Sequence, residues 1–271
     1  MNYSGYIDIG VNLTNRRLLS QADTLIEAAA AVGVEGQIVT ATSAAHSEQA
    51  QALCRRFPQR LRCTCGVHPH DASEWDEETA RRIAALARDD KVVAIGETGL
   101  DYNRNFSPRE RQLEAFEAQL ELAAELALPV FLHQRDALDD FVALLGQWRD
   151  RLPGAVAHCF TDDRDALFRL LDLDCHIGIT GWVCDERRGQ ALQQAVPEIP
   201  ANRLMLETDA PYLLPRDLPE PPKDKTNRPQ YLPHIAATVA RLQGKPLEQL
   251  ASEVWQTTLD FFQPGFGAKP S

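Results

Sequence analysis

The sequence predicts an α/β fold, a (β/α)₈ TIM barrel built as one domain over residues 1–271. Eight short β-rich runs alternate with longer amphipathic stretches, which is typical of a parallel sheet with crossover helices. A chain of 271 residues has about the length that such a barrel needs. No glycine-rich phosphate loop follows the first run, which disfavours an open, doubly wound sheet.

The β-rich runs are short, and helix signatures occur in the stretches between them. The runs begin at Tyr6, Gly36, Leu61, Val92, Pro129, Gly154, Cys175 and Arg203. The clearest helix follows the fourth run, with Ser107 as a predicted N-cap, Pro108 in the first turn and Glu110 as a capping-box acid. Its apolar stripe is predicted to comprise Leu113, Phe116, Leu120, Ala123 and Ala127.

A proline-rich segment, Pro215–Pro233, separates the eighth run from a final helix. Its composition is incompatible with a regular element, so a long loop on the upper rim of the barrel is expected. Loops of this length are either functional or disordered, and a solvated connector is the alternative to a functional loop.

Charge and composition limit the classes of partner. The chain carries 28 basic and 39 acidic side chains and a net charge of −11, so it has no general attraction for polyanions. Six cysteines are too few for a disulfide scaffold, and the N-terminus has no basic flank before an apolar run. No apolar run has the length of a membrane span. We expect reduced thiols, a cytoplasmic location and no membrane insertion.

Polar residues follow most of the predicted strands, at Asn12, His68, Glu97, His133, His158, Glu207 and Asp209. Active sites of (β/α)₈ barrels assemble at this end of the strands, so these side chains should converge. Glu97 is accordingly expected to be a rim carboxylate and not a buried charge. A single histidine in such a position is usually structural, but the repetition in "IGE", "FLH" and "VAH" indicates a divalent-metal site. Imidazole and carboxylate ligands suit Zn²⁺, Mn²⁺ or Fe²⁺, and carboxylates also admit Mg²⁺.

Hydrolysis is the reaction that such a site favours, because a bound divalent ion lowers the pKa of water toward neutrality. The chain has no G-x-S-x-G nucleophile motif. Cys159 is expected on the opposite face of its strand from His158, in the core, and Cys63 and Cys65 are expected to be buried packing residues.

With these residues identified, the chain resembles the TatD family of metal-dependent deoxyribonucleases, which have amidohydrolase-like barrels. The matching stretches are "GVHPHD", "AIGETGLDYNRN", "FLHQRD", "AHCFT", "IGITGWVCDERRG" and "LETDAPYLLPRDL", and they extend in order over nearly the whole sequence.

The resemblance implies roles for particular residues. Glu97, His133 and His158 would be metal ligands, and Asp209 would bind metal or deprotonate the attacking water. His68 would face the substrate phosphate. Glu207, two residues before Asp209 on a strand, would hydrogen-bond to a ligand. Mg²⁺ is the ion expected in function, with Mn²⁺ or Zn²⁺ as alternatives.

One departure from the family pattern concerns the first strand. Most members carry a His-x-His pair there, whereas this chain has Gly10 and Asn12, and Asp8 could compensate only in part. We therefore predict one well-occupied metal site and a second that is weak or filled together with substrate.

The resemblance also implies 3′→5′ exonuclease action on DNA, preferably at single-stranded ends, with RNA as a further substrate. Because long-range repulsion is screened within about 8 Å at physiological salt, local basic residues would hold the phosphates. The predicted substrate contacts are Arg104, Arg135, Arg187 and Tyr212. Further rim candidates are Arg16, Arg17, Arg188, Arg216, Lys223, Lys225 and Arg228, with Tyr102, Phe160 and Trp182 as stacking residues.

Two other functions fit the same residues. The first is a metal-dependent amidohydrolase acting on a small amide or ester. The second is a nucleic-acid-binding protein with weak catalysis, suggested by the missing first-strand histidines. A monomer is expected, since a barrel of this size can be stable as a single chain.

Overall fold

The computed structural model describes residues 5–263 and 265 of the chain. The predicted domain, 1–271, extends over positions 1–4, 264 and 266–271, which lie outside the described residues. The described strands form one eight-stranded parallel sheet in sequential order. They are β1 Tyr6–Val11, β2 Val34–Val39, β3 Leu61–Cys65, β4 Val92–Asp101, β5 Val130–Arg135, β6 Ala155–Ala157, β7 His176–Ile179 and β8 Leu204–Leu206.

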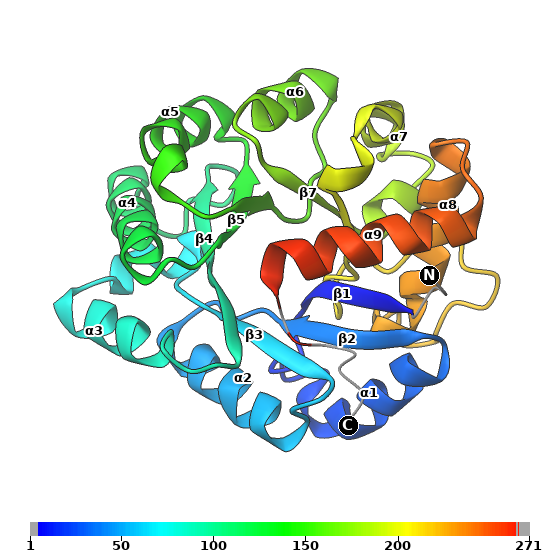
Figure 1. Ribbon diagram of the computed structural model, residues 1–271, viewed down its shortest axis with the longest axis horizontal. Helices are drawn as coiled ribbons and strands as arrows, with labels where there is room; N and C mark the ends of the chain where they lie inside the picture. Colours follow the sequence, from blue (N-terminus) through cyan, green and yellow to red (C-terminus); the bar gives the residue numbers. More distant parts are fainter. Residues whose placement is uncertain (1–4, 264, 266–271) are drawn as a thin grey trace.

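The sheet curls into a nearly closed barrel with the helices around it (Figure 1). Next to the first and last strands, the described residues form an isolated parallel bridge between Val11 and Ala210, which helps to close the barrel. The helices are α1 Ala22–Ala31, α2 Ala44–Arg56, α3 Glu77–Leu86, α4 Arg109–Leu126, α5 Leu138–Trp148, α6 Arg164–Asp172, α7 Gln190–Ala195, α8 Leu232–Leu242 and α9 Leu247–Phe262. This confirms the predicted (β/α)₈ barrel.

Two apolar clusters stabilise the barrel. The larger cluster lies between the sheet and the surrounding helices and includes Phe116 and Leu120 of α4. The smaller cluster contains alternate strand residues such as Ile7, Ile9 and Phe131, and side chains of α9 pack against it. Because α9 also crosses the barrel (Figure 1) and contacts β1 and β8, it covers the end opposite the strand carboxyl termini. The other end stays available for a site.

The predicted cap of α4 is wrong in detail. Ser107 does not cap the helix, since its Oγ accepts a hydrogen bond from the Ser73 amide (2.9 Å) and donates one to the His70 carbonyl (2.8 Å). Pro108 occupies the N-cap position without a side-chain hydrogen bond. Tertiary contacts with the 3₁₀ helix after β3 (Pro69–Glu74) therefore override the local capping signal. Ala127 is exposed and left-handed (φ 51°), because the helix ends at Leu126.

The proline-rich loop after β8 is confirmed over most of its predicted length. Between β8 and a short 3₁₀ helix at Pro229–Tyr231, the described chain has no regular element apart from the Ala210 bridge. Pro233 lies inside α8 instead of ending the loop, and α9 follows, so two helices and not one follow the loop within the described residues.

A histidine at the start of β7 should make folding stability depend on pH. Burial and the guanidinium of Arg203 lower the pKa of His176 to about 4, with Arg149 acting in the same direction and Asp174 opposing it. Its ring also contacts Phe261 of α9, with ring centroids 4.6 Å apart. The unfolded chain, with an ordinary histidine pKa of about 6.5, binds more protons between about pH 4 and 6.5. Stability is therefore lost as the pH falls through this range.

We expect the free energy of unfolding to fall by about 1 to 2 kcal/mol more for the natural chain than for His176→Gln when the pH is lowered from about 7.5 to 5. Urea denaturation of both proteins at the two pH values measures this difference. Equal losses in the two proteins would show that His176 does not carry the effect.

Candidate metal centre

A cavity of about 1040 Å³ lies at the carboxyl end of the barrel. All eight strands, or the segments directly after them, contribute lining residues, and these include Asn12, Thr40, His68, Glu97, His133, His158, Trp182 and Asp209. Most of the polar strand-end residues singled out from the sequence therefore surround one space. The convergence follows from parallel strands that all end at the same rim.

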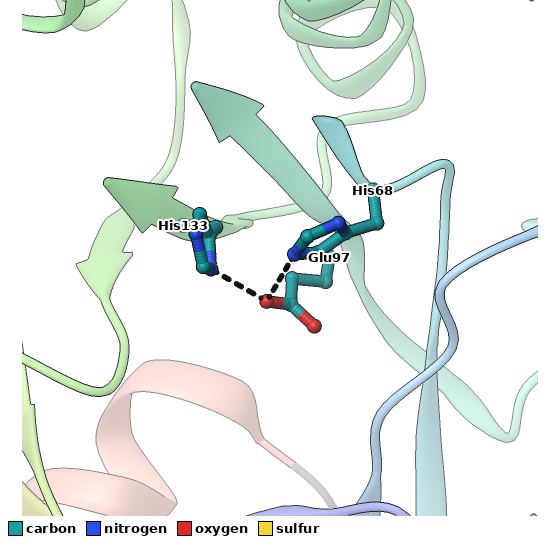
Figure 2. Close-up of side chains that lie close together, drawn as sticks. All are labelled: His68, Glu97 and His133. Carbon is teal, nitrogen blue, oxygen red and sulfur yellow. Dashed lines mark hydrogen bonds and ion pairs between the residues drawn. The ribbon is translucent and has the colours of Figure 1, made fainter. Parts of the chain in front are cut away.

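Glu97 is the centre of this group. Its Oε1 lies 2.7 Å from His158 Nε2, 2.9 Å from His133 Nδ1 and 3.3 Å from His68 Nε2. Figure 2 shows the rings of His68 and His133 pointing to the same carboxylate oxygen. The expectation of an unburied rim carboxylate is wrong, because Glu97 is only 6% exposed. It lies within β4, four residues before the strand ends, and it lines the cavity.

The charges in this cluster are mutually dependent. Burial opposes ionisation of Glu97, but the facing imidazoles of His158 and His68 outweigh it and hold the pKa of the carboxyl well below its usual range. Burial would lower the pKa of His158, but Glu97 and Glu207 outweigh it and raise the pKa well above 6.5. Glu97 therefore stays ionised, and its negative charge favours a positive charge beside it in the cavity.

The donor set fits a divalent cation. Ligand atoms of His68, Glu97 and His133 all lie within 4.8 Å of one another. His158 is outside that set of three but contacts the same Glu97 oxygen. Imidazole nitrogens and a carboxylate oxygen are ligands shared by Zn²⁺, Mn²⁺ and Fe²⁺. His68, which the sequence assigned to the substrate phosphate, is therefore also positioned as a candidate ligand.

Asp101 and His70 were missed from the sequence. Asp101 Oδ2 lies 3.3 Å from His133 Nε2 and 2.9 Å from His70 Nε2. A carboxylate in this position orients an imidazole ligand and fixes its tautomer. The spacing could have indicated this position for Asp101. It follows Glu97 by four residues, and side chains at even spacing on a strand share a face. His70 lay in the quoted "GVHPHD" motif without an assigned role.

Asp209 lies beyond β8 and not on a strand, contrary to prediction. It adopts a left-handed conformation (φ 53°), and its amide donates to the Gly10 carbonyl at 2.8 Å. Asn12 Nδ2 donates to Asp209 Oδ1 at 2.9 Å. Burial, together with the negative charges of Glu97 and Glu207, raises the pKa of Asp209 to about 7. A carboxyl group with that pKa can exchange a proton near neutral pH.

Glu207 also lies after β8, and it is fully buried beside His158. Its Oε2 lies 3.2 Å from His158 Nδ1, and its Oε1 accepts a hydrogen bond from the Cys159 amide. This is the kind of contact that the predicted role of Glu207 requires. A β-carbon at position 10 would collide with Glu207 Oε2, so Gly10 leaves the space that this carboxylate fills.

Asp8 is held away from the cavity. Its carboxyl group accepts hydrogen bonds from the Thr208 amide (2.9 Å) and hydroxyl (2.5 Å), and burial raises its pKa to about 8. Asp8 is absent from the cavity lining and thus does not replace a first-strand ligand there.

Cys159 was expected in the core, and this was wrong. Strand β6 ends at Ala157, and Cys159 adopts a left-handed conformation (φ 49°) that ends the strand alternation and places it at the cavity. Burial and the nearby Asp209 carboxyl raise the pKa of its thiol well above 9. The thiol is therefore a poor nucleophile. Cys63 and Cys65 are buried, as expected.

The predicted substrate contacts separate into two groups. Arg104, Arg135 and Tyr212 line the cavity. Arg187 does not, and its guanidinium lies 3.6 Å from Asp185 and 3.9 Å from Glu186. Among the further candidates, Arg16 and Trp182 line the cavity, whereas Phe160 is buried.

Phe106 is an exposed aromatic side chain at the cavity that the sequence did not single out. It is 68% exposed, lines the cavity and contacts the His70 ring, with centroids 4.8 Å apart. An exposed phenyl ring of this kind offers a surface on which a base can stack. Its position between a predicted strand and a predicted helix gave no sign of this exposure.

Comparison with known proteins agrees with this architecture. The family model described as TatD related DNase matches residues 7–263. The "3′-5′ ssDNA/RNA exonuclease TatD" of Erwinia billingiae is 54% identical over 246 residues, covering 91% of this chain and 94% of that protein. The protein of the same name from Enterobacter lignolyticus is 55% identical over 246 residues, with 91% and 94% coverage.

A solved structure gives the same result for the fold. The crystal structure of a TatD homologue from Escherichia coli K12 superposes with a TM-score of 0.88 at 27% identity, covering 95% of this chain and 98% of that one. The match of the family model over almost the whole chain, together with relatives above 50% identity, shows that the chain belongs to the TatD related DNase family.

Proposed function

We propose that this protein is a divalent-metal-dependent 3′→5′ exonuclease that hydrolyses phosphodiester bonds of single-stranded DNA and of RNA. The observation that carries the proposal is the Glu97 carboxylate, which contacts three imidazoles in the lining of a cavity of about 1040 Å³. The relatives named 3′-5′ ssDNA/RNA exonuclease support the polarity and the substrate class.

Glu97, His133 and His158 would hold the metal, with His68 and Asp209 in reach of the same space. Mg²⁺ is the proposed ion in function, and Mn²⁺ or Zn²⁺ could replace it. When bound, such a cation lowers the pKa of water and neutralises charge on a phosphoryl oxygen.

The chain's own residues would supply the proton transfer. Asp209, with a pKa of about 7, is suited to accept the proton of the attacking water, and Asn12 fixes the orientation of its carboxyl group. Asp101 would orient His133, and Glu207 would orient His158. The products are a 5′-mononucleotide and a chain shortened at its 3′ end.

Cleavage of single-stranded DNA labelled at its 5′ end tests the proposed function. Products shortened stepwise from the 3′ end with Mg²⁺, and no products with a chelator, are expected. Hydrolysis of a small cyclic amide without DNA cleavage would instead identify an amidohydrolase. Tight DNA binding without metal-stimulated cleavage would identify a binding protein.

Arginines at the cavity should contribute to substrate binding by different amounts. Arg104→Ala is expected to weaken single-stranded DNA binding about tenfold and to reduce its salt dependence, because a phosphate contact is lost. Arg187→Ala is the matched control, since Arg187 lies outside the cavity lining and pairs with Asp185. Fluorescence anisotropy at several salt concentrations measures both. Equal losses in the two variants would contradict the assignment.

One tight Mg²⁺ or Mn²⁺ ion per chain is expected without substrate. Glu207 fills the space beside Gly10, and Asp8 is bonded to Thr208, so a second set of strong ligands is not assembled around β1. Isothermal titration with Mn²⁺ measures the number of sites. Two tight Mn²⁺ ions per substrate-free chain would contradict the expectation.

We also propose a cytoplasmic monomer. Within the described part of the chain, none of the helices is long and apolar enough to cross a membrane. Sedimentation of the purified protein measures the oligomeric state.

A further inference from the structure

A second cluster of metal-ligating side chains lies outside the nuclease cavity. Ligand atoms of Cys184, Asp217 and His234 all lie within 4.8 Å of one another. None of the three lines the cavity. They come from three separate segments: the 3₁₀ helix after β7 (Gly181–Cys184), the long loop after β8, and the first turn of α8.

The donor atoms are positioned by contacts already in place. His234 Nε2 lies 2.7 Å from Asp217 Oδ1, and the Cys184 thiol is 3.5 Å from Thr238 Oγ1, one turn further along α8. Cys184 is only 3% exposed. The side chains of Asp217 and His234 are 47% and 27% exposed, so a cation and one water molecule could enter from solvent.

Neighbouring ion pairs hold Asp217 beside the cysteine. Arg216 contacts Glu186 at 3.2 Å and Asp185 at 3.6 Å, and both acids directly follow Cys184. The same two chain segments are therefore already joined one residue away from the cluster. This reduces the ordering that a cation would have to impose.

The chemistry of the three donors selects the ion. A thiolate, an imidazole and a carboxylate form a borderline-to-soft set that favours Zn²⁺ over Mg²⁺. Zinc bonds of about 2.0 to 2.3 Å at tetrahedral angles put the ligand atoms about 3.3 to 3.7 Å apart. The His234 and Asp217 atoms, 2.7 Å apart, must therefore separate slightly, and any wider spacing in the cluster, at most 4.8 Å, must close by about 1 Å. The bound ion would replace the His234–Asp217 hydrogen bond and the thiol proton, and water would complete a tetrahedral shell.

We propose that Cys184, Asp217 and His234 form a zinc site that fastens the loop after β8 to the segment after β7 and to α8. The fastened loop includes Tyr212 and Leu213, which line the nuclease cavity. The site is separate from the proposed catalytic metal, and its existence does not depend on nuclease activity.

Cobalt spectroscopy of the metal-free full chain tests this proposal. Added Co²⁺ is expected to give the charge-transfer absorption of a thiolate-bound ion, and Zn²⁺ should displace it. The band should disappear in Cys184→Ser and persist in Cys159→Ala, which removes the thiol at the nuclease cavity. A band that is absent from the natural chain, or retained in Cys184→Ser, would overturn the proposal.

His234→Gln provides an independent variant, because His234 is partly exposed and its replacement should not impair folding. We expect this variant to bind Zn²⁺ at least about tenfold more weakly. Zn²⁺ should slow amide hydrogen exchange over residues 213–228 in the natural chain but not in His234→Gln. Equal protection in both proteins would also overturn the proposal. Cleavage of DNA is not a readout here, so failure of this site is distinct from failure of the nuclease.

Discussion

The Glu97→Gln variant is expected to lose nuclease activity by about 10³-fold, because the carboxylate at the centre of the cluster is replaced by a neutral amide. Three imidazole nitrogens lie within 3.3 Å of Glu97 Oε1, so the substitution removes the negative charge that all of them share. An amide is a weak metal ligand, and its NH₂ group would face imidazole nitrogens that act as ligands only when they are unprotonated.

Single-turnover cleavage of single-stranded DNA and Mn²⁺ titration measure the two consequences of this substitution. Both activity and tight metal binding should be lost, while circular dichroism stays that of the natural chain. Glu48→Gln is the matched control, since Glu48 pairs with Arg82 on the surface and is remote from the cavity lining. Activity of Glu97→Gln within tenfold of the natural chain would remove Glu97 from the catalytic centre.

A second large effect is expected from Gly99→Ala in β4. Gly99 has a φ of 138°, which side chains rarely adopt, and a β-carbon there would collide with the carbonyl oxygen of His133 on β5. Gly99 and His133 are paired residues of the two strands. The obstructing atom belongs to the backbone and cannot rotate away. Strands β4 and β5 must therefore separate at His133, which is a candidate metal ligand.

We expect Gly99→Ala to be destabilised by about 3 kcal/mol or more, which corresponds to a fall in Tm of roughly 6 °C or more for a chain of this length. Metal affinity should fall with it, because His133 is displaced. Gly33→Ala is the control, since Gly33 also has a positive φ (87°) but no atom within 4 Å of a β-carbon. Gly33→Ala should lower the free energy of unfolding by about 1 kcal/mol. Thermal unfolding compares the two, and equal losses would mean that crowding against His133 is unimportant.

The prediction of the strands succeeded because their signal is local. Each strand is a short apolar run, and parallel pairing in sequence order follows once eight of them alternate with helices. The convergence of Glu97, His133 and His158 was predictable for the same reason, since parallel strands end at a common rim. No knowledge of side-chain packing was needed for either inference.

Two predictions failed because a strand or a helix does not begin or end where the local sequence pattern indicates. Strand alternation was extended to Cys159, but β6 ends at Ala157 and a left-handed residue redirects the chain. Ser107 stands where a helix N-cap is expected, but its hydroxyl group forms hydrogen bonds with the 3₁₀ helix after β3 instead. For Ser107, contacts with a distant segment outweigh a capping preference worth about 1 kcal/mol. For Cys159, the backbone amide donates to Glu207, a residue of a distant segment.

The barrel, the family resemblance and the convergence of Glu97, His133 and His158 could all be predicted from the amino-acid sequence. Their signals are the alternation of strands and helices and the order of the motifs, and both can be read without a structure. Only the tertiary structure decided that Glu97 is buried, that Asp101 supports His133, that Asn12 holds Asp209 across 197 positions, and that Cys184, Asp217 and His234 meet. These facts depend on register, on chain reversals and on which side chains share a space. Such relations are set by the packing of the whole molecule, and residues near one another in sequence do not encode them.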